Sequence, residues 1–153
     1  MHMVFRTFIE NTSVEQVFNL IANIDDYDTW LPPSKAFLGV RHVSDNPVRA
    51  GTTYTDGQGV VRMHGKVAVF GPHEQVVFYQ ESNFRALGLI PSGLNIMVDY
   101  ILVQEHNGVT VIRNHEVEFR GVLKVLRAMA LSRIKSENER ILQVMKDVLE
   151  KTY

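Results

Sequence analysis

Hydrophobic and polar residues alternate along most of the chain, which is typical of strands with one buried face. The alternation runs from Met3 to Ile9 and returns between residues 36 and 119, where Gly, Asn, Asp and Pro interrupt it. The segments between these interruptions predict six further strands, over residues 36–43, 52–56, 60–70, 75–82, 94–104 and 109–119. We expect the apolar residues 84–93 to form a loop and residues 106–108, His-Asn-Gly, to form a hairpin turn.

Helical spacing replaces the alternation in two places. Ser13 and Gln16 form a capping-box pattern ahead of an apolar stripe at residues 14, 17, 18 and 21, which predicts a short helix. Residues 25–33, DDYDTWLPP, predict a further single helical turn ended by the two prolines. Residues 122–153 lack Gly and Pro and have apolar residues at helical spacing, which predicts one long helix. The fold class is therefore α+β, a seven-stranded antiparallel sheet around a long C-terminal helix, with two short helices after the first strand.

Length and composition limit the classes of protein. A chain of 153 residues predicts a single domain over 1–153. A net charge of -1 argues against a nucleic-acid partner, and the lack of cysteine excludes disulfides and thiolate catalysis. No apolar run approaches the ~18 residues that span a bilayer, and the N-terminus lacks a signal-peptide pattern. We therefore expect a cytoplasmic protein without stable membrane insertion, either a monomer or a homodimer.

The strand predicted over 109–119 raises a question about chemistry. Arg113 and His115 fall on the same face as the apolar residues at 109, 111, 117 and 119, the face expected to be buried. A buried cation is unfavourable unless it is paired or hydrated, and a ligand hydroxyl or carboxylate can supply the partner. Burial would lower the pKa of His115, so that a neutral imidazole could act as a base. Alternatively, Arg113 pairs with Glu81 or Asp99, and His115 is a hydrogen-bonded core residue.

Other residues are expected to line the same cavity. The predicted ligand contacts are Tyr100, Tyr79, Tyr54, Trp30, Val98, Val111, Leu126 and Met129. The tyrosines can donate a hydrogen bond to a ligand, or they pack in the core with the hydroxyl at its rim. Trp30 covers the cavity or fixes the short helices to the sheet. His64 falls on the polar face of its strand and is expected to be solvated, with Met63, Gly65 and Val67 inside.

Several common kinds of site find no support in the sequence. There is no HExxH or His-x-His motif, so we predict no metal site. No Gly-rich phosphate loop joins a strand to a helix, and no serine lies in a nucleophile-elbow pattern. We therefore predict no cofactor.

Two stretches resemble a known group. TSVEQVFNLIANIDDYDTWLPP, residues 12–33, is similar to the early helix pair of polyketide cyclase/dehydrase-like proteins, and GVTVIRNHEVEFRG, residues 108–121, is similar to their last strand, with Asn107 where a first glycine is common. The whole order resembles the helix-grip fold of the START-like (SRPBCC, Bet v 1-like) superfamily. This resemblance implies a cavity between the sheet and the C-terminal helix that takes an apolar, aromatic, lipid-like or polyketide-like molecule.

Three functional hypotheses follow. In the first, the protein binds a hydrophobic small molecule for transport, sensing or processing, and Arg113 and His115 orient it. In the second, it is a polyketide cyclase or dehydratase with His115 as acid or base and Arg113 beside an enolate. In the third, the apolar 84–93 segment and the basic early part of the long helix make transient contact with a membrane or another protein.

Overall fold

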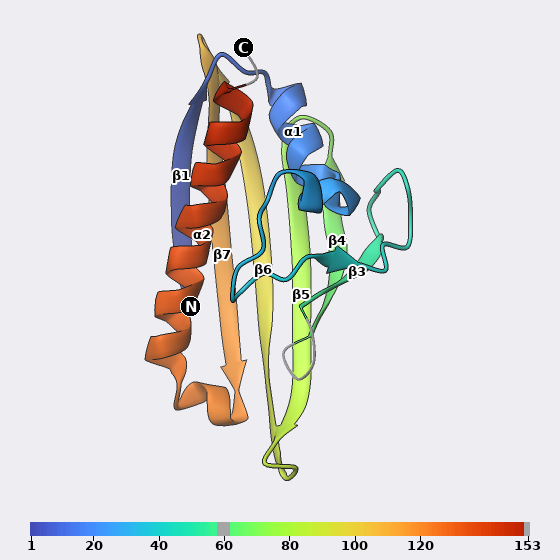
Figure 1. Cartoon of the computed structure of the whole chain (residues 1–153), viewed down its shortest axis with the longest axis vertical. Coiled ribbons are helices and arrows are strands. Elements are labelled where there is room, and N and C mark those ends of the chain that lie inside the picture. The colour runs from blue at the N-terminus through green and yellow to red at the C-terminus, as the bar shows by residue number, and fades with distance from the viewer. Residues whose placement is uncertain (58–61, 152–153) are drawn as a thin grey trace.

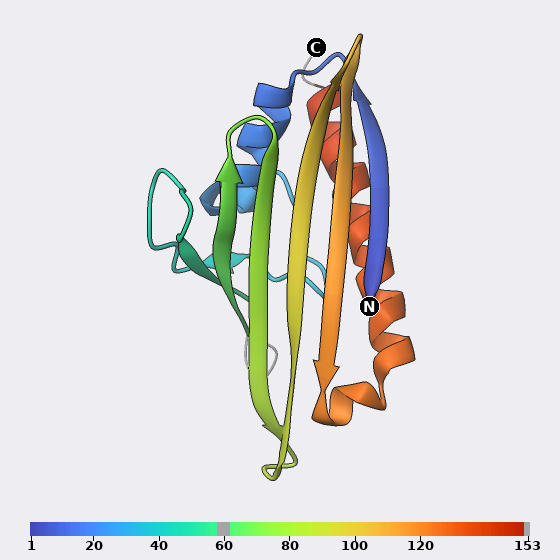
Figure 2. The same cartoon turned by 180° about the vertical axis from the view of Figure 1, so that it is seen from behind.

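The computed structural model describes residues 1–57 and 62–151 and contains one curved antiparallel sheet around a long helix (Figure 1, Figure 2). The strands are β1 (His2–Glu10), β2 (Val40–Arg41), β3 (Thr53–Asp56), β4 (Met63–Gly71), β5 (Gln75–Ala86), β6 (Ile90–Glu105) and β7 (Gly108–Arg120). Their order across the sheet is β1-β7-β6-β5-β4-β3-β2. The predicted α+β architecture is confirmed.

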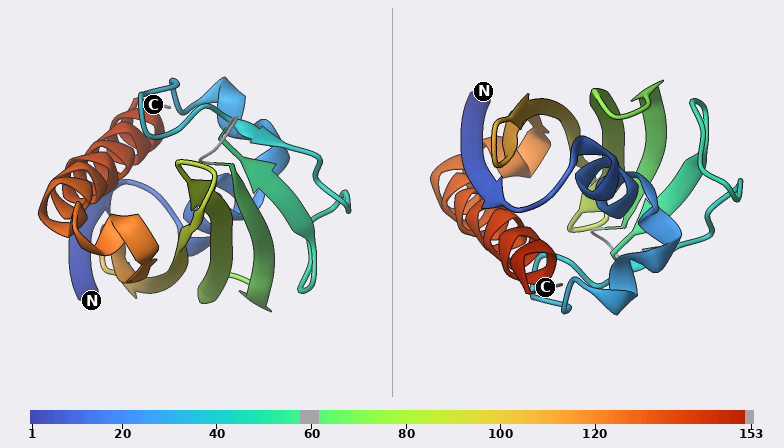
Figure 3. Two further views of the ribbon diagram at one scale, coloured as in Figure 1. Left: turned by 90° about the horizontal axis from the view of Figure 1, so that it is seen from below. Right: turned by 90° about the horizontal axis from the view of Figure 1, so that it is seen from above.

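Two short helices follow β1, as predicted. Helix α1 (Val14–Ala22) begins at a complete capping box, in which the Ser13 hydroxyl accepts from the Gln16 amide and the Gln16 side chain accepts from the Ser13 amide. The 3-10 helix η1 (Ile24–Thr29) comes directly after it. Seen along the long axis, these helices and α2 lie on the same concave side of the sheet (Figure 3).

The long helix starts later than predicted. Gly121 has a φ of 62°, in the left-handed region, and opens a 3-10 turn, η3 (Gly121–Lys124). Helix α2 (Arg127–Glu150) then runs back along the sheet. The prediction of one continuous helix from Val122 is therefore wrong for its first turn.

Strand boundaries differ from the prediction at both ends of the sheet. Only β2 forms within 36–43, because the Ser34 hydroxyl accepts from the amides of Ala36 and Phe37 and holds them in a turn. The predicted 84–93 loop is instead the end of a long hairpin with a three-residue tip, residues 87–89. Pro91 is tolerated there since β6 pairs with β7 only from Gly93 onward. Residues 60 and 61 of the predicted fourth strand lie outside the described residues.

Strand β4 follows the predicted alternation until a bulge. Met63, Gly65 and Val67 are buried, and His64 is exposed. The register with β5 then shifts between Val67 and Val69. Val69 therefore points to solvent, although simple alternation would place it on the same face as Met63, Gly65 and Val67.

The core has two hydrophobic clusters with two polar positions between them. The larger cluster packs the apolar stripe of α2, formed by Ile141, Leu142, Met145 and Leu149, against α1 and against the part of the sheet beside α1. The smaller one packs the first half of α2 against the lower sheet. On β7, Val111 belongs to the larger cluster and Val117 to the smaller one, so Arg113 and His115 occupy the two inward positions between them.

Candidate functional site

Arg113 and His115 both lie on the buried, inner face of β7. Their exposed fractions are 7% and 4%, while their neighbours Ile112, Asn114 and Glu116 are more exposed. The period-2 alternation therefore predicted their direction correctly. Neither of the predicted carboxylate partners, Glu81 and Asp99, pairs with Arg113.

Arg113 is a buried cation packed over the ring of Tyr100. Its guanidinium carbon lies 4.7 Å from the ring centroid of Tyr100, which faces it directly across the β6–β7 pair. No described carboxylate comes within 4.0 Å of its nitrogens, and its Nε is buried without a hydrogen-bond partner. Burial lowers the pKa of Arg113 from 12.5 to about 10, against weaker attraction from Tyr27 and Glu137. The side chain remains charged at neutral pH.

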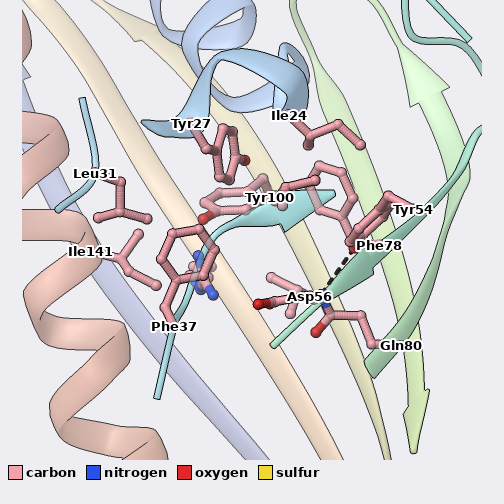
Figure 4. Close-up of a pocket in the computed structure, with 13 residues that line it drawn as sticks. Ile24, Tyr27, Leu31, Phe37, Tyr54, Asp56, Phe78, Gln80, Tyr100 and Ile141 are labelled. Carbon is pink, nitrogen blue, oxygen red and sulfur yellow. Dashed lines mark hydrogen bonds between the residues drawn. The ribbon is translucent and has the colours of Figure 1, made fainter. Parts of the chain in front are cut away.

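Arg113 lines a cavity of about 80 Å³, and Figure 4 shows most of the other residues around it. Its walls are Ile24, Tyr27, Leu31, Phe37, Val40, Tyr54, Asp56, Phe78, Gln80, Val98, Tyr100, Arg113 and Ile141. Phe78 packs edge-on against Tyr54 on one side and Tyr100 on the other, with ring centroids 6.2 and 6.3 Å away. Gln80 Nε2 donates to the Tyr54 hydroxyl over 3.0 Å, which fixes that phenol at the cavity wall.

Asp56 is a functional candidate that the sequence did not single out. It ends β3, its carboxyl reaches the cavity wall (Figure 4), and its Oδ1 is buried without a hydrogen-bond partner among residues 1–57 and 62–151. Burial, with repulsion from Glu137, raises the pKa of Asp56 from 3.8 to about 7. An acid with that pKa can donate or accept a proton near neutral pH.

A larger groove of about 730 Å³ adjoins the cavity at Asp56, which lines both. Met63, Leu94 and Ile96 form its sheet side. The other wall is the first half of α2 and residues 34–38. The cavity alone holds only a few waters, whereas the groove is within the range of ordinary small-molecule sites, about 300–1,000 Å³.

Polar contacts join α2 to the segment before β2 along one side of the groove. Glu137 accepts from the Ser34 hydroxyl over 3.0 Å and pairs with Arg140 over 2.6 Å. Arg140 also donates to the Pro32 carbonyl over 2.9 Å. This segment carries Phe37 into the cavity wall, so the contacts of Glu137 hold one side of the site in place.

His115 is oriented by α2 and lines neither space. Its Nδ1 lies 3.1 Å from Oδ1 of the buried Asn138, whose Nδ2 donates to the Ile134 carbonyl over 2.7 Å. Because Oδ1 only accepts, Nδ1 carries the proton. Nε2 is buried without a hydrogen-bond partner in the described part of the chain. Burial and the charge of Arg113 lower the pKa of His115 from 6.5 to about 3, which makes it a very weak base.

The other predicted contact residues divide into three groups. Tyr54, Tyr100 and Val98 line the cavity. Val111 and Trp30 are buried but do not line it. Trp30 packs on Tyr27 with ring centroids 5.2 Å apart, so it joins the short helices to the core.

Three predicted contacts lie away from the cavity. Tyr79 borders a hollow on the outer face of the sheet beside Lys66, because Phe78 and Gln80 take the inward positions of β5. Leu126 and Met129 are exposed, because the chain turns between η3 and α2. For these three, the predicted inward placement is wrong.

Among residues 1–57 and 62–151, no group of three or more His, Cys, Asp or Glu side chains is placed to hold a metal ion. In the same part of the chain, no helix is long and apolar enough to cross a membrane.

Comparison with known proteins gives structural matches only. No family model matches this sequence, and no curated protein matches it. MLL2253 from Mesorhizobium loti superimposes with a TM-score of 0.75 at 12% identity, over 100% of this chain and 99% of that one. The Aha1 dimer from Colwellia psychrerythraea gives 0.66 at 15% identity, over 98% and 96% of the two chains. DynU16, a protein in the dynemicin biosynthetic locus, gives 0.64 at 15% identity, over 97% of this chain and 47% of that one.

The chain has a helix-grip fold. At such low identities the matches establish this fold and leave the activity open.

Proposed function

We propose that the protein binds an elongated, mostly apolar small molecule with one acidic or hydroxyl end, lipid-like, aromatic or polyketide-like. The polar end would lie at Arg113 in the cavity, and the apolar part would extend past Asp56 into the groove. The observation that carries the proposal is the buried guanidinium of Arg113, which has no carboxylate within 4.0 Å among the described residues and sits at a cavity wall. A ligand carboxylate or hydroxyl would supply the missing partner.

The shape of the site supports an apolar ligand body. Aromatic and aliphatic side chains form most of the cavity wall, and the groove continues along Leu94 and Ile96. DynU16 lies in a biosynthetic locus, which supports a small-molecule ligand over a macromolecular one.

Matched aliphatic probes test the proposal. Displacement of a bound fluorescent dye would be measured for dodecanoic acid, dodecanol and dodecylamine. We expect the acid to bind at least about tenfold more tightly than the amine, because only the acid pairs with Arg113. In Arg113→Met this order should disappear, while Arg41→Met, which removes an exposed arginine, should keep it. Equal affinities in the unsubstituted protein would contradict the proposal.

A second candidate is an acid–base reaction in the same cavity. Asp56 favours it, since its pKa of about 7 suits proton transfer and it lines the space where the ligand is proposed to lie. The earlier hypothesis with His115 as the base has less support because of its low pKa. Turnover of a compound co-purified from the native host, lost in Asp56→Asn while binding persists, would identify an enzyme.

A further inference from the structure

Apolar side chains stand in solvent at one end of the molecule. Leu87 and Leu89 form the tip of the β5–β6 hairpin, and 91% and 79% of their surfaces are exposed. At the same end of the molecule (Figure 1), the turn between η3 and α2 exposes 86% of Val125. Figure 1 and Figure 2 both show the hairpin tip and this turn at the lower end of the molecule. A hydrogen bond of 3.0 Å from the Val122 amide to the Ser92 hydroxyl joins them.

We call this surface the apolar end and define it as Leu87, Leu89, Ile90, Val125, Leu126 and Met129. These six make up half of the large hydrophobic residues that are exposed in the described part of the chain. Leu87 also has a φ of 52°, a left-handed conformation that disfavours leucine and suits glycine or asparagine. Burial in an apolar medium would offset the unfavourable exposure of these side chains.

Charge is segregated toward the same end. Residues 82–95 and 119–136 contain six of the sixteen basic residues and none of the seventeen acidic ones. Lys124 and Arg127 are exposed beside Val125, and Arg85 and Arg120 border one hollow at the base of the hairpin. A protein with a net charge of -1 thus presents a locally cationic surface around the apolar side chains.

The combination of exposed apolar side chains and surrounding positive charge distinguishes between possible binding partners of the apolar end. A second copy docked end to end would bring like charges together, which is unfavourable. A lipid bilayer with anionic headgroups has an apolar interior and a negatively charged surface, so it matches both features.

We propose that the apolar end docks on membranes that contain anionic lipids. Leu87, Leu89 and Val125 enter the acyl region, while Lys124 and Arg127 lie against headgroup phosphates. The contact is peripheral and reversible, and it does not depend on the ligand of the cavity.

Vesicle co-sedimentation tests the docking with two compositions, phosphatidylcholine alone and phosphatidylcholine with about 30% phosphatidylglycerol. We expect binding only to the anionic vesicles, weakening as salt rises from low to physiological concentration. Leu87→Asn/Leu89→Asn should weaken it by at least about tenfold. Lys124→Gln/Arg127→Gln should weaken it by about fivefold for each charge removed.

Matched variants on the outer face of the sheet serve as controls. Val4→Thr/Val103→Thr removes two exposed apolar side chains elsewhere, and Arg6→Gln/Lys66→Gln removes two exposed charges elsewhere. The hydrophobic control should bind as the unsubstituted protein does, and the charge control should lose less than Lys124→Gln/Arg127→Gln. Equal losses in test and control variants would overturn the proposal.

A site-specific label gives an independent readout. Since the chain has no cysteine, Leu89→Cys takes a single environment-sensitive fluorophore. Its emission should shift to the blue with anionic vesicles, while the same label at Val103→Cys should not respond. If the label at Leu89 shows no shift, the proposal is overturned. It is also overturned if the protein dimerises with rising concentration, if Leu87→Asn/Leu89→Asn abolishes that dimer, and if no vesicle binding occurs; the surface would then belong to another partner.

Discussion

Replacing Arg113 by methionine should raise the free energy of unfolding of the ligand-free protein. Burial lowers the pKa of Arg113 from 12.5 to about 10. At about 1.4 kcal/mol per pKa unit, the buried charge destabilises the folded state by about 3 kcal/mol at neutral pH. Because the folded pKa of this base is the lower one, the penalty is complete below pH 10 and disappears as the pH passes 12.5. Methionine fills a similar volume without the charge.

The contact with Tyr100 reduces the expected gain. A desolvated cation–π pair contributes about 1–2 kcal/mol, which methionine loses. The net increase should therefore be about 1–2 kcal/mol, or a rise in Tm of about 3–6 °C for a chain of this size.

Urea unfolding can be followed by the fluorescence of Trp30, the single tryptophan. Arg41→Met removes an exposed arginine paired with Asp28 and should change the stability by less than about 0.5 kcal/mol. A loss of more than about 1 kcal/mol in Arg113→Met would refute the reasoning. Such a loss would mean that groups of the folded protein already compensate the charge of Arg113. The argument that a ligand carboxylate supplies its partner would then no longer hold.

Three other outcomes follow from the same region. Asp56 has a folded pKa of about 7 against an ordinary 3.8, so the stability it contributes is full below pH 4 and lost as pH rises to 7. Asp56→Asn should remove that pH dependence and, by urea unfolding at pH 8, gain about 4 kcal/mol. The pKa of His115 is lowered from 6.5 to about 3, so its effect on stability is opposite to that of Asp56: the stability is present above pH 6.5 and is lost as pH falls toward 3. ¹⁵N NMR at pH 5 should show a neutral ring protonated at Nδ1. A titration midpoint above 6 would contradict the burial argument. Gly65→Ala should cost about 1–3 kcal/mol, because a Cβ there overlaps the Tyr54 ring, and Tyr54→Leu should reduce that cost in a double-mutant cycle followed by thermal unfolding.

The direction of Arg113 and His115 was predictable because β7 alternates without interruption. Strand β5 gave no such signal. Residues 76–79 are Val-Val-Phe-Tyr, apolar on both faces, so the sequence could not show that Phe78 points inward and Tyr79 outward. Period-2 reasoning succeeds where polar residues mark one face and fails where neither face is marked.

Asp56 and Met129 show two other limits. Asp56 precedes a glycine, which is typical of a turn, and its burial arises only when β3 pairs with β4 and residues 34–38 cover it. Met129 has the spacing of a buried stripe only if the helix begins at Val122. The left-handed Gly121 and the following 3-10 turn delay α2 and leave Met129 in solvent. Both errors come from contacts between distant segments, which local patterns do not contain.

One strand connects the two proposed surfaces. Strand β6 begins at Ile90 in the apolar end, lines the groove with Leu94 and Ile96, and reaches the cavity with Val98 and Tyr100. Leu94 and Tyr100 are separated by about 20 Å of extended chain. A ligand with its polar end at the cavity would therefore extend its apolar part toward the end that meets the membrane.

This arrangement predicts that the affinity for the ligand in solution and the rate of ligand uptake from a membrane depend on different residues. Leu87→Asn/Leu89→Asn should slow uptake of dodecanoic acid from anionic vesicles while leaving its affinity in solution unchanged, because neither leucine lines the cavity or the groove. Arg113→Met should lower the affinity in solution and leave vesicle docking intact, because Arg113 is buried far from the hairpin tip. Stopped-flow transfer and equilibrium displacement measure the two quantities independently. If the leucine substitutions weakened binding in solution as much as they slowed transfer, the hairpin would belong to the ligand site itself, and the membrane would have no separate role in delivery.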